Sequence, residues 1–116
     1  MRHAFDFRIG RTRLLGLNNA TGPLAAEALG ALRERLDGAA AAGERVVLCM
    51  HRNIVGLHPE WGRQTEEENR DLLALIRERA VPRVLAGHWH EYHEETRGPT
   101  RFVVVPPTGD RSIETG

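Results

Sequence analysis

Residues 81–90 read VPRVLAGHWH, and this stretch decides the expected fold class. Pro82 cannot continue a helix, and the apolar residues that follow it are typical of a short interior β-strand. A second apolar run, RVVLCM at 45–50, has the same character. Helix-like segments at 23–42 and 65–80 precede the two runs, so helices and strands alternate along the chain. This alternation predicts an α/β domain whose interior strands are parallel and covered on both faces.

The two expected helices are marked by the spacing of their apolar residues and by capping signals. Leucines recur at helical intervals from Pro23, a favoured first residue of a helix, to about Ala42. Thr65 and Glu68 stand three residues apart, as in a capping box. They predict a second helix that runs from there to near Ala80.

Two β-hairpins are expected at the ends of the chain. Residues 3–9 alternate between apolar and polar side chains, and 12–18 read as the returning strand. Segments 90–96 and 100–105 flank a turn at Arg97-Gly98 and form the second hairpin. The antiparallel strands would extend the parallel interior strands into a mixed sheet.

Size and composition limit the possible functions. The 116 residues predict a single domain, 1–116, and the formal net charge of zero argues against non-specific binding to nucleic acid. No apolar run approaches the about 20 residues of a membrane span, so no membrane contact and a cytoplasmic location are expected. Cys49 is the only cysteine, which excludes a disulfide within the chain, and its apolar neighbours indicate a small packed side chain.

Two of the expected interior strands end in histidine. His51 follows the run 45–50, and His88 and His90 follow the run after Pro82. Ligands collect at the carboxyl ends of strands in open α/β sheets, and alternate residues of an extended chain point to the same side. A single histidine after a strand is usually a surface residue, but three on matching strand ends favour a site for Zn, Mn or Fe.

The order of VVLCMH, an amphipathic helix and VPRVLAGHWH resembles the C-terminal half of the calcineurin-like metallophosphoesterases. In that family one strand ends in a metal-binding histidine and a later strand ends in a Gly-His-x-His motif. The stretch HAFDFRIGRTRLLGLNN and the helix that follows it also look like the preceding segment of the family, so the resemblance covers nearly the whole chain. It implies a partial metallophosphoesterase-like layered β-sandwich with flanking helices and a mixed sheet.

The resemblance also implies roles for individual residues. His51 and His88 would bind one metal of a two-metal centre (Mn, Fe or Zn) and His90 the other, for the hydrolysis of a phosphomonoester or phosphodiester. Arg52 and Asn53 stand where the family often has a second histidine and a proline, and are candidates for binding the substrate. Arg52 suits a phosphate, and equally a salt bridge to a carboxylate.

The family's other ligands belong to N-terminal motifs that have no match in this sequence, among them an Asp-x-His motif and the aspartate that bridges the metals. No catalytic residue is therefore assigned within the chain. Without a bridging carboxylate two dications repel each other, so one metal or none is expected in this chain alone.

Three hypotheses follow. The chain is part of a metal-dependent phosphoesterase that requires a complementary N-terminal half, or the three histidines form a mononuclear Zn site with water as the fourth ligand. Alternatively, it is a non-catalytic degenerate domain that acts through homodimerisation or partner binding. The third hypothesis predicts uncovered apolar side chains at Phe5, Phe7, Val103 and Val105, where a second sheet would pack.

Overall fold

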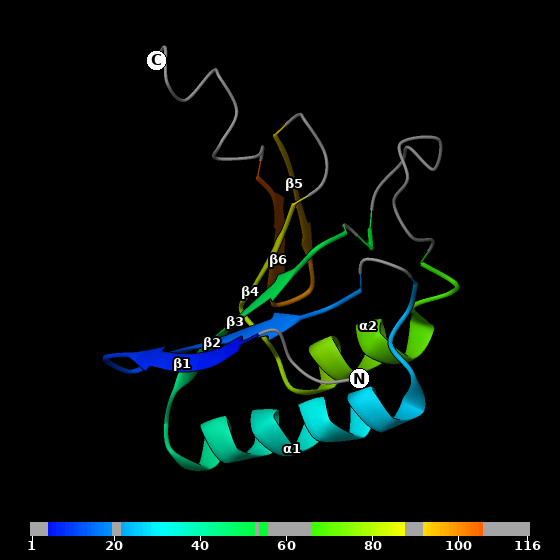
Figure 1. The fold of residues 1–116 in the computed structure, drawn as a ribbon. Coiled ribbons are helices and arrows are strands. Elements are labelled where there is room, and N and C mark those ends of the chain that lie inside the picture. The colour runs from blue at the N-terminus through cyan, green and yellow to red at the C-terminus, as the bar shows by residue number, and fades with distance from the viewer. Residues whose placement is uncertain (1–4, 20–21, 53, 56–65, 88–91, 106–116) are drawn as a thin grey trace.

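The computed structural model describes residues 5–19, 22–52, 54–55, 66–87 and 92–105. They form a mixed α/β fold with one six-stranded sheet and two helices (Figure 1). The elements are β1 (Phe5–Ile9), β2 (Thr12–Leu17), α1 (Ala26–Ala41), β3 (Arg45–Met50), α2 (Arg70–Glu78), β4 (Arg83–Ala86), β5 (His93–Arg97) and β6 (Thr100–Val104).

The sheet has the strand order β1-β2-β3-β4-β6-β5. Strands β2, β3, β4 and β6 are parallel, and β1 and β5 pair antiparallel at the two edges. The predicted parallel interior and both hairpins are therefore confirmed. Because these parallel strands are neighbours, their carboxyl ends lie side by side where the strands end. This end of the sheet is called the rim below.

One face of the sheet is covered by both helices and holds the core (Figure 1). Along β3, Val46, Leu48 and Met50 point to this face and are buried, whereas Val47 and Cys49 point to the other face and are only partly buried. The prediction that the interior strands are covered on both faces is wrong for the described residues. Those residues form a single sheet, and the second sheet implied by the resemblance is not part of them.

The other side of the sheet is called the open face. Its apolar residues follow from the strand register and come from β1, β2, β3, β4 and the β6 end: Phe5, Phe7, Ile9, Leu14, Val47, Cys49, Leu85, Val103 and Val105. Phe5, Phe7 and Val105 are 39%, 48% and 37% exposed, and Val103 is partly buried. The predicted apolar exposure is thus confirmed for Phe5, Phe7 and Val105 and only in part for Val103. The ring of Phe5 lies over Gly16, where an added Cβ would come within 2.6 Å of its carbons.

An ion-paired cluster joins the first hairpin to α1 on the covered face. Arg13 donates two hydrogen bonds to Asp6, at 3.0 and 2.9 Å, and Arg35 of α1 contacts the same carboxylate. The hydrogen bonds from Arg13 hold the pKa of Asp6 below its ordinary value of 3.8. The aspartate is therefore charged at neutral pH and fixes the edge hairpin against the helix.

Both helices begin later than the sequence predicts. α1 begins at Ala26 rather than Pro23, because Leu24 is buried in the core from an extended segment and the first helical hydrogen bond runs from the Leu29 N–H to the Ala25 carbonyl. α2 begins at Arg70, and the residues just before it form turns. Glu66 in that segment pairs with Arg97 of β5, a tertiary contact that the local capping pattern does not include.

Candidate functional site

The rim brings together segments that are far apart in the sequence. Leu17, Met50 and Ala86 are aligned as the last residues of β2, β3 and β4. The Gly87 N–H donates a hydrogen bond to the Met50 carbonyl at 3.2 Å. A Cβ at Gly87 would lie 3.8 Å from the carbonyl oxygen of His51. His51 and Gly87, the residue before His88, are therefore neighbours.

Asn19 holds the backbone of this site from the end of β2. Its Oδ1 accepts hydrogen bonds from the N–H groups of His51 and Arg52, at 2.9 and 3.0 Å. Its Nδ2 donates to the Arg52 carbonyl at 3.0 Å. The Asn19 side chain is 1% exposed, so these bonds are made away from water. They fix the turn that directs His51 and Arg52 out of the strand.

The sequence pattern predicts a loop after β2 and indicates no role for Asn19. The structure shows that β2, expected only as the returning strand of a hairpin, is also parallel to β3, so Asn19 follows the carboxyl end of a parallel strand as His51 does. The sequence does not show that Asn19 contacts the backbone of residues 51 and 52, which follow it by more than thirty positions.

The chain beyond the turn is anchored as well. His51 is exposed and Arg52 is half-buried, whereas Ile54 and Val55 are completely buried. The turn is thus held on one side by Asn19 and on the other by two core residues. These contacts hold the backbone from which His51 and Arg52 project.

His88, His90 and Asn53 lie outside the described residues, so the predicted convergence of the three histidines stays a prediction. Within the part of the chain that the structure describes, no group of three or more His, Cys, Asp or Glu side chains is placed to hold a metal ion. His51 is the one predicted metal ligand that the structure places. Arg52, the predicted phosphate contact, is placed directly beside it.

Cys49 precedes this turn by two residues and points to the open face. Burial raises the pKa of its thiol. The thiol is therefore protonated at neutral pH and packs as a small apolar group, although it is partly rather than fully buried.

Comparisons with known proteins show the fold alone. No protein-family model matches this sequence, and no curated protein matches it. A solved structure described as "GAP50 the anchor in the inner membrane complex of Plasmodium" is similar, with a TM-score of 0.66 and 13% sequence identity. The match covers 88% of this chain and 35% of that chain, so this chain spans about a third of that protein's length. Neither described helix is long and apolar enough to cross a membrane.

Proposed function

We propose that this chain is the C-terminal part of a metal-dependent phosphoesterase, with His51, His88 and His90 as metal ligands. The observation that carries the proposal is the adjacency of β3 and β4 at the rim, where Gly87 is hydrogen-bonded to Met50. Gly87 lies next to His51, and in the sequence it is followed directly by the His-Trp-His triplet. Two strand ends at one rim are the usual location of a site in a parallel sheet.

The donor set suits a borderline metal ion such as Zn, Mn or Fe, because all three ligands are imidazoles. When bound, such a metal supplies a nucleophilic hydroxide and polarises the phosphate. The chain's own residues position the reactants. Asn19 fixes the backbone of the first ligand, and Arg52 and Asn53 bind the phosphate oxygens, Arg52 through charge-assisted hydrogen bonds.

The site of this chain is incomplete for two metals. No cluster of carboxylates with His51 exists among the described residues, and neutral imidazoles do not offset the charge of a second dication. The remaining ligands would come from a complementary N-terminal half. That half would also supply the second layer of the β-sandwich by covering the open face. The match to only 35% of a longer chain of similar fold supports this arrangement.

Metal binding by the chain itself tests the proposal. Calorimetric titration with Zn or Mn is expected to give one ion per chain, and His51→Ala, His88→Ala and His90→Ala should each weaken binding by at least about tenfold. His58→Ala is the matched control and should leave binding unchanged. The absence of stoichiometric binding, or equal binding by the His88→Ala variant, would contradict the proposal.

Hydrolysis of bis(p-nitrophenyl) phosphate distinguishes the versions of the proposal. With Mn and the chain alone, little or no turnover is expected, and a gain is expected when a complementary half is added. Turnover with Zn by the chain alone, lost in the His90→Ala variant, would instead favour the mononuclear three-histidine site with its activated water.

A non-catalytic role is the second candidate, and the open face favours it. Exposed apolar side chains on one side of a sheet mark a surface that another protein covers. In this case the chain acts through a homodimer or a partner, and the histidines have no metal. Calorimetry without metal binding, together with a stable dimer in sedimentation velocity, would favour this candidate.

A further inference from the structure

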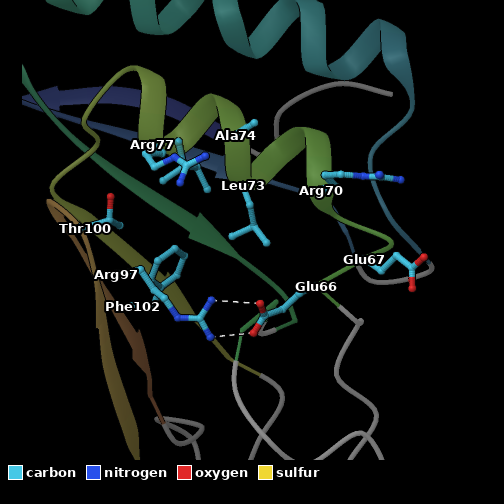
Figure 2. A pocket seen from close by; sticks show the side chains of 11 residues that line it. Glu66, Glu67, Arg70, Leu73, Ala74, Arg77, Arg97, Thr100 and Phe102 are labelled. Atoms are coloured by element: carbon cyan, nitrogen blue, oxygen red, sulfur yellow. Dashed lines mark hydrogen bonds and ion pairs between the residues drawn. The ribbon is translucent and has the colours of Figure 1, made fainter.

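A cleft on the covered side of the sheet has no role in the proposed phosphoesterase. It lies between α2 and the hairpin of β5 and β6, and its volume is about 580 Å³ (Figure 2). Ligand pockets of proteins are typically about 300–1,000 Å³. The open face lies on the opposite side of the sheet, so covering it would leave this cleft accessible.

The floor of the cleft is apolar. Leu73 and Ile76 come from α2 and Phe102 comes from β6. Figure 2 shows Leu73 directed into the space between the helix and the hairpin. The hydroxyl of Thr100, which also lines the cleft, already donates its proton to the Val81 carbonyl at 2.6 Å and has no donor left for a ligand. The floor therefore favours the apolar body of a ligand over a sugar or another polyol.

One wall is closed by a charged pair. Arg97 donates two hydrogen bonds to Glu66, at 3.0 and 2.7 Å, and also contacts Glu95 (Figure 2). Both side chains of the pair remain partly exposed, at 41% and 39%. The charge of Arg97 is thus balanced by carboxylates of the protein, and this arginine shapes the cleft rather than attracting an anion.

Arg77 is differently placed. It follows Leu73 by four residues, so the two side chains lie on the same stripe of α2. No carboxylate pairs with Arg77 or Arg70 within the described part of the chain, and both line the cleft. Figure 2 shows Arg70 pointing away from the Arg97–Glu66 pair, toward the side of Glu67. Of the two unpaired arginines that line the cleft, Arg77 is the one that lies on the side of Thr100 and Phe102 in Figure 2.

We propose that this cleft binds a small organic anion with an apolar body. The body packs against Leu73 and Phe102, and the anionic head accepts hydrogen bonds from the Arg77 guanidinium. An apolar surface with an unpaired cation at its margin selects for amphipathic carboxylates, sulfonates or phosphates. This inference does not depend on the metal site or on the proposed hydrolysis.

The probe for the test is 2-naphthalenesulfonate, titrated into isotopically labelled protein and followed by amide chemical shifts. Saturable shifts are expected at residues of α2 and β6. Arg77→Gln should weaken binding about tenfold, as expected for the loss of a charge-assisted contact. The uncharged 2-naphthol should bind about tenfold more weakly to the unaltered protein for the same reason.

Two further variants make the test decisive. Arg33→Gln removes an exposed arginine of α1 that does not line the cleft and should leave binding unchanged. Leu73→Asn removes the apolar floor at a partly exposed position and should weaken binding by about tenfold or more while shift dispersion shows a folded protein. Shifts confined to the open face, equal losses in the two arginine variants, or full binding by Leu73→Asn would each overturn the inference.

Discussion

The substitution Asn19→Ala removes the side chain that fixes the turn at His51. Two backbone N–H donors and one carbonyl acceptor lose their partner at the same time. A hydrogen bond contributes about 0.5–1.5 kcal/mol to folding, and a buried group left without a partner costs about 1–3 kcal/mol. Water reaches part of this turn, because His51 is exposed. The free energy of unfolding should therefore fall by about 2–4 kcal/mol.

That loss is large beside the total stability of a domain of this size, which is about 5–15 kcal/mol. The measurement is urea denaturation followed by circular dichroism, with the midpoint and the slope reported separately. Asn19→Asp keeps two acceptor contacts but sets a carboxylate oxygen against the Arg52 carbonyl and buries its charge, so it should cost at least as much as Asn19→Ala.

Thr100→Val is the matched control. It removes one buried hydrogen bond, to Val81, far from the rim and without a change of shape. The expected loss is about 1–2 kcal/mol, because one carbonyl, that of Val81, loses its side-chain partner. If Asn19→Ala costs no more than this control, the amide does not hold the turn, and the support that it gives to His51 is refuted.

Three further changes test other parts of the structure. Phe7→Ser, on the open face, should weaken self-association in sedimentation velocity and leave the urea midpoint nearly unchanged; an unaltered association constant would show that this face is not the contact. Gly30→Ala should raise the free energy of unfolding by about 0.5–1 kcal/mol, because open space surrounds this helical position. Gly16→Ala should lower the free energy of unfolding, because the new Cβ meets the packed ring of Phe5. Equal changes in the two variants would refute this distinction. The hydrogen bonds from Arg13 lower the pKa of Asp6, so the stability that they contribute is present above pH about 4 and is lost as the pH falls through the lowered pKa. Asp6→Asn should therefore reduce the fall in the free energy of unfolding at acid pH, and an unchanged fall would contradict this.

The order of elements could be read from the sequence because each boundary has a local cause. Pro82 precludes continuation of a helix, Gly43 adopts a φ of 70° just after α1, and short apolar runs of strand length lie between the helices. The starts of the helices could not be read in this way. The burial of Leu24 and the pairing of Glu66 with Arg97 depend on residues distant in the sequence.

Whether one or both faces of the sheet are buried could not be predicted from the sequence, for a related reason. The run RVVLCM has the composition of a strand buried on both faces, yet Val47 and Cys49 are only partly buried here. Composition shows what environment a strand suits, not whether this chain supplies it. The same holds for the candidate site. The position of His51 after β3 marks it as a candidate from the sequence, whereas the role of Asn19 depends on a contact between segments that are distant in the sequence.

The buried core and the uncovered apolar surface lie on opposite sides of this sheet. The buried apolar cluster, including Leu15, Leu32 and Leu48, lies with the two helices, whereas Phe5 and Phe7 on the other side are 39% and 48% exposed. Substitutions at the most exposed positions of the latter side, such as Phe7 and Ile9, should therefore change the surface that the protein presents more than its melting temperature. A library randomised at such positions would vary this surface and leave the buried core unchanged.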